Sequence, residues 1–222
     1  MHQIRCTIHM KLVKRLLLLL LLVLLTGTVW YLSRMRSFAA GGRKFVPTTQ
    51  NKISNATINE ALQFCKDKQF NTEVAFLINM EIESGENRFF VVDLASKKIL
   101  KSGLVTHGRC NQNWLVGRKY GNAVGCGCTS LGKYKIGKPY HGRFGLAYKL
   151  YGLDITNNNA FARFVVLHSH ECVPEKEVAP APICQSDGCP TVAPAFLKEL
   201  AAVIDKSERP VLLWIEGGRI KN

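Results

Sequence analysis

The chain has 222 residues, a formal net charge of +14 and eight cysteines. So many cysteines argue against a cytosolic enzyme, because disulfides persist in oxidising compartments outside the cytoplasm. Six of the positive charges lie in residues 1–36, which contain no acidic residue, so a net charge of +8 remains on the other 186 residues. This excess indicates an anionic partner, or else it only keeps the domain soluble.

The first predicted element is an uncharged, leucine-rich run of 17 residues from Leu16 to Leu32, with Trp30 and Tyr31 at its end. A membrane-spanning helix needs about 20 apolar residues, with a lower limit near 17, and Trp and Tyr favour the headgroup interface. More Lys and Arg residues precede the run than follow it, which places the N-terminus inside the cell. The sequence therefore predicts a cytoplasmic tail at 1–15 and a transmembrane anchor or signal at 16–36.

A cleaved signal peptide is the competing interpretation, because Ser37, Phe38 and Ala39 form a small-x-small pattern before Ala40. The apolar run is longer than a usual signal core, so the sequence favours an uncleaved anchor. Either way the rest of the chain is exported into the periplasm or another extracytoplasmic space. There, cell-wall polymer or anionic lipid headgroups suit its basic surface better than nucleic acid does.

Residues 37–56 lack apolar periodicity and are predicted to be a linker. The remaining 166 residues, 57–222, suffice for one domain with its own core. Thr57 is expected to cap a helix that runs to about Lys68, and 194–205 has the spacing of a second amphipathic helix.

Short runs rich in β-branched and aromatic residues predict strands. Three of them, separated by turn residues, predict an antiparallel meander, and three more follow later in the chain. These runs are Val74–Met80, Arg88–Leu94, Lys98–Thr106, Leu146–Leu150, Arg163–His168 and Pro210–Glu216. The fold class is therefore mainly β with a few helices.

The chemistry is carried by Ser186-Asp187-Gly188-Cys189, with His168-Ser169 upstream. A thiol attacks as its thiolate and needs a nearby base, which is usually distant in sequence, and His168 fits that role. Gly188 allows a sharp turn, so that the amides of Gly188 and Cys189 could face an oxyanion. This pattern predicts a cysteine acyl-transfer site.

The cysteine count is consistent with one free nucleophile. Cys6 stays with the N-terminal tail, and seven cysteines lie in the exported part. If Cys189 is unpaired, six remain for up to three bridges, whose pairing the sequence does not define. A bridge between Cys172 and Cys184 would close the loop between the proposed base and nucleophile.

A family resemblance rests on an ordered set of motifs between about Phe89 and Val192. They are Ser130-Leu131-Gly132 through Tyr140-His141-Gly142, Tyr148 through Asp154, Asn158, Ala160, Arg163 through His168, and Ser186-x-Gly188-Cys189. This set resembles the YkuD-like murein L,D-transpeptidase catalytic domain, in its smaller Ser-x-Gly-Cys-Pro branch.

The resemblance implies a β-sandwich with a cleft and no cofactor or metal. Cys189 would attack a peptidoglycan stem tetrapeptide, release D-alanine and pass the acyl group to an amine, giving a 3→3 crosslink, or to water. His168 would act as the base, Ser169 and Ser186 would position groups, and His107, Tyr140 and Asp187 are candidate substrate-binding residues. The enzyme is expected to act as a monomer.

Three alternatives remain open at this stage. The cleft could belong to a non-catalytic, membrane-tethered wall-binding module. His168, His170 and Cys172, together with Cys126 and Cys128, could hold zinc, whose preferred ligands are imidazole and thiolate. A phosphate loop around Lys133 is disfavoured, because a tyrosine occupies the position where a Ser or Thr would bind magnesium.

Two features of this chain depart from the commoner branch of the family. Asp187 replaces the usual histidine of Ser-His-Gly-Cys, and its carboxylate would disfavour a thiolate unless it pointed away or engaged a cation. The interval from His168 to Cys189 spans 21 residues and predicts a long loop over the site, which is either a lid or a plain insertion.

Overall fold

The computed structural model describes residues 22, 24–28 and 52–218. Residues 22 and 24–28 are helical, and within the described ranges no helix has the length and apolar character needed to cross a membrane. The predicted tail, most of the predicted anchor and the linker up to residue 51 lie outside the described residues. Residues 1–47 and 48–222 form separate units, and the second contains the fold described below.

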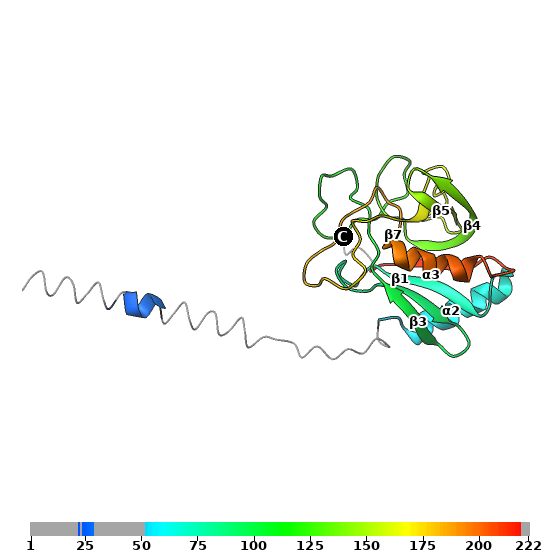
Figure 1. Ribbon diagram of the computed structural model, residues 1–222, viewed down its shortest axis with the longest axis horizontal. Helices are drawn as coiled ribbons and strands as arrows, with labels where there is room; N and C mark the ends of the chain where they lie inside the picture. Colours follow the sequence, from blue (N-terminus) through cyan, green and yellow to red (C-terminus); the bar gives the residue numbers. More distant parts are fainter. Residues whose placement is uncertain (1–21, 23, 29–51, 219–222) are drawn as a thin grey trace, which may run out of the picture. The chain divides into compact units, whose positions relative to one another are not determined.

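The folded unit contains two helices and eight strands within its described part (Figure 1). In chain order they are α2 (Asn55–Asp67), β1 (Val74–Asn79), β2 (Phe89–Asp93), β3 (Lys98–Gly103), β4 (Gly132–Gly142), β5 (Gly145–Gly152), β6 (Val166–Ser169), β7 (Thr191–Val192), α3 (Pro194–Ile204) and β8 (Leu212–Glu216). The prediction of a mainly β chain with a few helices is confirmed.

All eight strands belong to one sheet with the order β3-β2-β1-β8-β4-β5-β6-β7. The predicted meander is confirmed, because β1 pairs antiparallel with β2 and β2 with β3. β8 enters between the meander and β4, parallel to β1 and antiparallel to β4. The expected sandwich of two sheets is therefore a single continuous sheet, and α3 lies between its β1–β3 part and its β4–β5 part in Figure 1.

Two apolar clusters bury the two faces of the β1, β2 and β8 region. The larger contains residues of both parts of the sheet together with α3, including Phe76, Tyr148 and Leu200. The smaller packs α2 against the other face, through residues such as Ala61 and Leu77. Since β1 and β2 are covered on both sides, nearly all their side chains are buried, and these strands read as continuous apolar runs.

Helix α2 begins earlier than predicted. Ser54, not Thr57, is the N-cap, and its hydroxyl accepts a hydrogen bond of 3.0 Å from the Thr57 N–H. The Thr57 hydroxyl instead contacts Ser54 Oγ and a carboxylate oxygen of Glu216. Ile53, which the sequence assigns to the linker, is buried in the smaller cluster. The folded unit therefore extends into the predicted linker.

The β4 strand was not predicted, although it is the longest in the sheet. Its glycines, lysines and Pro139 are unusual in strands. Pro139 is tolerated because β8 pairs only with residues 132–135 of β4, and the β4–β5 pairing shifts register between Ile136 and Pro139. No ladder hydrogen bond to β8 is therefore lost at the proline.

Two predicted strands are shorter than expected near the site. The strand predicted from Arg163 begins only at Val166, because Phe164 has a φ of 56° and ends a series of turns. The strand predicted to reach Thr106 ends at Gly103. Between β3 and β4, residues 104–131 carry only isolated bridges, and this segment packs next to the candidate site.

Candidate active site

The segment Ser186–Cys189 forms a tight turn before β7. Ser186 Oγ donates a hydrogen bond of 2.7 Å to the carbonyl oxygen of Cys189 and accepts one of 3.2 Å from the Gly188 N–H. Gly188 has a φ of 108°, which side-chain-bearing residues rarely adopt. A Cβ on Gly188 would also lie 2.6 Å from the carbonyl oxygen of Cys128. The turn therefore requires glycine for both backbone conformation and space.

Cys189 carries a free, partly exposed thiol. Its Sγ lies 3.8 Å from the carbonyl oxygen of Phe164. Burial raises the pKa of the thiol above its ordinary value, while the Val166 N–H and the charge of Arg163 act in the opposite direction. The nearby Asp187 carboxylate raises the pKa further. The resting sulfur is thus a protonated thiol at neutral pH, and a base is required to activate it.

His168 lies on β6, directly opposite Thr191 in the parallel β6–β7 pair. Its Nδ1 lies 3.1 Å from the carbonyl oxygen of Ser169, and its Nε2 lies 3.0 Å from Thr191 Oγ1. A carbonyl only accepts, so the neutral ring carries its proton on Nδ1 and presents the Nε2 lone pair to the Thr191 hydroxyl. This is the tautomer that a base requires.

The imidazole is buried and held by an aromatic stack. The Phe144 ring, from the tip of the β4–β5 hairpin, lies 4.4 Å from the His168 ring with an interplanar angle of 20°. Burial lowers the pKa of His168, the Ser169 carbonyl raises it, and His170 lowers it slightly further. His168 is therefore neutral at physiological pH.

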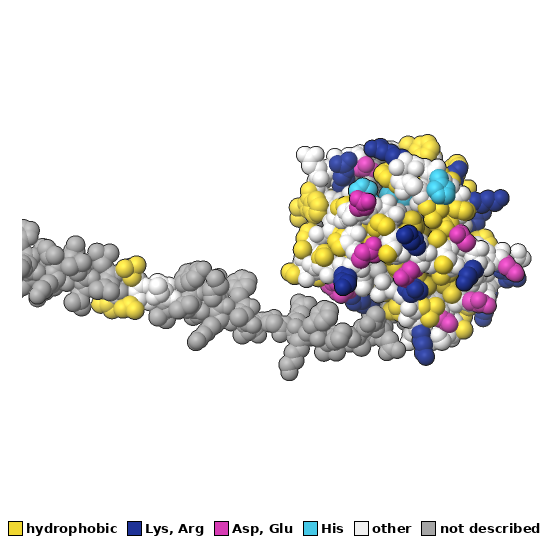
Figure 2. All heavy atoms as spheres, viewed as in Figure 1, with side chains coloured by type: hydrophobic (Ala, Val, Ile, Leu, Met, Phe, Trp, Pro, Cys, Tyr) yellow, Lys and Arg dark blue, Asp and Glu magenta, His cyan; other side chains and the backbone are white. Residues whose placement is uncertain are grey.

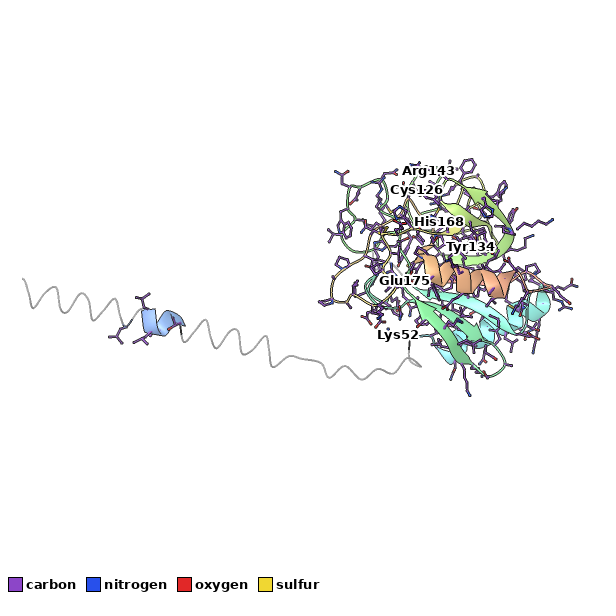
Figure 3. All side chains as sticks on the ribbon, in the orientation of Figure 1. Lys52, Cys126, Tyr134, Arg143, His168 and Glu175 are labelled. Atoms are coloured by element: carbon purple, nitrogen blue, oxygen red, sulfur yellow. A yellow bond between two sulfur atoms is a disulfide. The ribbon has the colours of Figure 1, made fainter. Side chains whose placement is uncertain are left out.

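His168 and Cys189 line the same cavity, which has a volume of about 580 Å³. Arg109, Arg143 and Trp114 also line it, so the walls combine cationic and aromatic groups. In Figure 3 both His168 and Arg143 lie in the upper part of the folded unit. Within the described residues the thiol and the imidazole share no direct hydrogen bond: Sγ contacts the Phe164 carbonyl oxygen, and Nε2 contacts the Thr191 hydroxyl.

Asp187 engages a cation, which is one of the two arrangements that the sequence left open. Its carboxylate forms a 2.7 Å ion pair with Arg109 Nε, at the rim of the same cavity. Both side chains are substantially exposed, so water screens the pair and it contributes little to stability. The pairing draws the Asp187 charge toward a guanidinium and limits its effect on the thiol.

His107 does not line the cavity that contains Cys189. It lines a neighbouring cavity of about 300 Å³, together with Arg88 and Arg118. Burial, reinforced by Arg88 and Arg118, lowers the pKa of His107 to about 4. Its Nδ1 lies 3.2 Å from Arg88 Nη2 and its Nε2 lies 3.3 Å from Gln185 Nε2. Because a guanidinium only donates, the neutral ring accepts from Arg88 at Nδ1 and carries its proton on Nε2.

Tyr140 also lies outside both cavities described above. It occupies β4, where Lys149 Nζ is 5.7 Å from its ring centroid. The expectation that Tyr140 binds substrate therefore gains no support from the cavity. Phe144, at the tip of the same hairpin, does line the site, where it stacks on His168.

The cysteine pairing differs in part from the expectation of up to three bridges. The predicted Cys172–Cys184 disulfide is present, and a second joins Cys110 to Cys128. Cys65 is instead a fully buried residue of α2, where burial raises the pKa of its thiol to about 12. A small apolar side chain suits that core position, and the cysteine count does not distinguish this use from a bridge.

The disulfides also remove the zinc alternative. Cys172 and Cys128, which that alternative requires as thiolates, are both oxidised. Residues 52–218 contain no cluster of three or more potential metal ligands. Lys133, the residue of the disfavoured phosphate loop, lies in β4, where it pairs with Glu60 and sits 3.9 Å from the Trp214 ring centroid.

The loop between His168 and Cys189 is anchored to the fold. Val173 and Ile183 belong to the main core, and the Cys172–Cys184 bridge closes the loop upon itself. Glu177 accepts a 2.7 Å hydrogen bond from the Asn87 N–H in the β1–β2 turn. These contacts favour an inserted structural segment over a lid.

Three important residues were not assigned a role from the sequence. Thr191 binds the base, Phe144 stacks on it, and Arg163 acts on the thiol while its guanidinium also binds the carbonyl oxygen of Cys128. Arg163 lies inside the motif quoted for the family, which was the signal available for it. Thr191 and Phe144 are brought in by strand pairing and by a hairpin, which leave no local signal.

The sequence profile of the L,D-transpeptidase catalytic domain matches residues 48–213. No curated protein sequence matches the chain. Solved structures with similarity include the helical cell shape determining protein of Campylobacter jejuni, at 14% identity and a TM-score of 0.38, covering 75% of this chain and 57% of that one. An L,D-transpeptidase from Xylanimonas cellulosilytica has 12% identity and a TM-score of 0.37, covering 69% and 68%.

An L,D-transpeptidase from Mycobacterium smegmatis has 13% identity and a TM-score of 0.38, covering 65% of this chain and 58% of that one. The chain thus spans little more than half the length of the Campylobacter and Mycobacterium proteins. The profile match extends over about three quarters of the 222 residues, so the chain belongs to the L,D-transpeptidase catalytic domain family.

Proposed function

We propose that the protein is a peptidoglycan L,D-transpeptidase with Cys189 as nucleophile and His168 as base. The substrate is a stem tetrapeptide, and the donor bond is the one between its third residue and the terminal D-alanine. The observation that carries the proposal is that a free thiol and a neutral imidazole, from paired segments, line one cavity of about 580 Å³.

The first step is activation of the thiol. Both the lowered pKa of His168 and the raised pKa of Cys189 disfavour a resting thiolate–imidazolium pair. The proton is therefore transferred to Nε2 as the sulfur attacks, once the Thr191 hydroxyl gives up that lone pair. The Ser169 carbonyl keeps the proton on Nδ1 and stabilises the imidazolium that forms.

The second step forms a thioester and releases D-alanine. The new carbon–sulfur bond replaces the peptide bond, and the imidazolium returns its proton to the leaving amine. An amine of a neighbouring stem or a water molecule then attacks the thioester, which gives a 3→3 crosslink or L,D-carboxypeptidase activity and frees the thiol. The reaction uses these side chains and requires no cofactor.

The Cys189 N–H is the better candidate for stabilising the oxyanion. The Gly188 N–H is occupied by Ser186 Oγ, so the role proposed for Gly188 is to shape the turn. Ser186 acts through the same turn, because its hydroxyl also holds the Cys189 carbonyl. A single backbone N–H directed at the oxyanion is consistent with catalysis, since such donors stabilise the negative charge that develops on the oxygen in the transition state.

The proposed location is the cell envelope, with the catalytic domain outside the cytoplasmic membrane and the N-terminal segment as its anchor. The two disulfides support an oxidising compartment. On the face shown in Figure 2, Lys and Arg side chains are spread among acidic and apolar ones and do not gather in one area. That distribution favours contact with a dispersed polymer over a single compact anionic ligand. The proposed active form is a monomer.

The test is release of D-alanine from a disaccharide tetrapeptide by the full chain, with Cys189→Ala as the control. We expect release by the parent protein only, and a mass increase of Cys189 that corresponds to the disaccharide-tripeptide acyl group. A non-catalytic wall-binding module would instead bind the substrate without release. Equal D-alanine from both proteins would refute Cys189 as the nucleophile.

A further inference from the structure

A second sulfur cluster lies outside the proposed catalytic pair, in the segment between β3 and β4. Cys126 is a free, partly exposed thiol two residues from Cys128, which is bridged to Cys110. Figure 3 labels Cys126 in the upper part of the folded unit. The proposed reaction uses none of these three residues.

The distances place the Cys126 thiol beside the bridge. Cys126 Sγ and Cys128 Sγ each lie 3.4 Å from the position that a Cβ would take on Gly121, so the sulfurs are separated by less than twice that distance. The Cys128 N–H donates a hydrogen bond of 3.4 Å to Cys126 Sγ, so the thiol contacts the backbone of the residue that carries the bridge. The intervening Gly127 has a φ of 62°, the backbone conformation of a tight turn.

We propose that Cys110, Cys126 and Cys128 form a thiol–disulfide exchange site. The Cys126 thiolate attacks Cys128 Sγ, a Cys126–Cys128 bond forms, the Cys110–Cys128 bond breaks, and Cys110 leaves as a thiolate that takes up the proton. Attack on Cys110 Sγ gives the Cys110–Cys126 isomer in the same way. Each step exchanges one disulfide for another, so it consumes no oxidant or reductant.

The exchange site contacts the nucleophile turn. The carbonyl oxygen of Cys128 lies against Gly188, and the same oxygen accepts a hydrogen bond from Arg163, whose charge lowers the pKa of Cys189. The bridge is also tied to the segment before it, because the Cys110 N–H donates to the Gly127 carbonyl oxygen at 3.0 Å. A change in the disulfide pairing of Cys128 would therefore move the carbonyl group that contacts both Gly188 and Arg163.

The exchange is tested by disulfide mapping of the full chain in a Cys6→Ser, Cys189→Ala background. Cys65 and Cys126 are then the remaining unpaired thiols, and Cys65 is buried. The protein is incubated at mildly alkaline pH, quenched in acid, alkylated in denaturant with N-ethylmaleimide and digested with trypsin. Trypsin separates 110–118 from 120–133, so a Cys126–Cys128 bond frees the first peptide and the Cys110–Cys126 isomer moves the label onto Cys128.

We expect label on Cys110 or Cys128 to increase with time, and none on either in a matched Cys126→Ser variant. The Cys172–Cys184 bridge should stay unlabelled in every sample, which controls for general scrambling. Label confined to Cys126 and Cys65 at all times would overturn the proposal. Label on Cys110 in the Cys126→Ser variant would also count against it, because a thiol other than that of Cys126 would then be opening the bridge.

The contact with the nucleophile is tested with Cys189 restored. Cys110→Ser leaves Cys126–Cys128 as the bridge of the site, whereas Cys126→Ser keeps Cys110–Cys128. With matching far-UV circular dichroism, the two variants should differ in the rate at which iodoacetamide alkylates Cys189. Equal rates would separate the exchange site from the nucleophile turn. Because alkylation needs no peptidoglycan, its outcome is independent of the transpeptidase proposal.

Discussion

Replacing Gly188 with alanine tests whether the nucleophile turn is as tightly constrained as its geometry indicates. A side chain at a φ of 108° is strained, which costs roughly 1–3 kcal/mol. Its Cβ would also lie 2.6 Å from the Cys128 carbonyl oxygen, a backbone atom that cannot rotate away, and overpacking of this kind costs roughly 1–3 kcal/mol more. We expect Gly188→Ala to lower the free energy of unfolding by about 3 kcal/mol or more.

Gly117 supplies a matched control. Its φ of 78° is also positive, but no atom lies within 4 Å of the position of a Cβ there. Gly117→Ala should therefore cost only the conformational strain, roughly 1–2 kcal/mol. Urea unfolding of both variants followed by circular dichroism gives the two free energies. Equal destabilisation would refute the argument that the Cys128 carbonyl leaves no room behind the nucleophile.

Three further predictions concern the proposed base and nucleophile. Phe144→Ala removes the stack on His168, worth about 0.5–1.5 kcal/mol, and exposes the ring to water, so an NMR titration should show the pKa of His168 rising toward its ordinary value. An unchanged titration would show that the stack does not shield the ring. Asp187→Asn should lower the pKa of Cys189 and speed its alkylation at fixed pH, with little loss of stability, and Arg109→Gln should cost equally little stability. Slower alkylation in Asp187→Asn would contradict the assigned sign. D-alanine release should rise with pH through the lowered pKa of His168 and fall only above the raised pKa of Cys189. A pH range of activity narrower than the interval between the ordinary pKa values of histidine and cysteine would argue against a resting neutral pair.

The sequence predicted the elements whose evidence is local. The apolar runs of β1, β2 and β3, the apolar face of α3 and the turn chemistry between strands all lie within a few residues of one another, and the structure contains them. The pairing of β8 with β1 joins segments more than a hundred residues apart and leaves no periodicity to detect. The sequence did not predict β4, because its glycines and its proline are unfavourable in strands.

The sequence predicts those residues of the candidate site that a recognisable motif contains. Cys189 and His168 follow from the chemistry that a thiol nucleophile needs, and the structure places both in one cavity. Thr191 could not be assigned because its importance depends on lying opposite His168 in the β6–β7 pair. The role of Tyr140 in substrate binding stays a prediction, because Tyr140 lines neither of the two cavities described above.

The parallel pairing of β6 with β7 has a consequence for protein engineering. Strand register, and not the length of the intervening chain, fixes where His168 stands relative to Thr191. Lys176 is exposed in that connection, whereas its neighbour Glu175 accepts a hydrogen bond of 3.1 Å from the Ala195 N–H at the start of α3. An epitope tag or fluorophore-bearing peptide grafted after Lys176 should therefore leave the spatial relation of imidazole and sulfur unchanged.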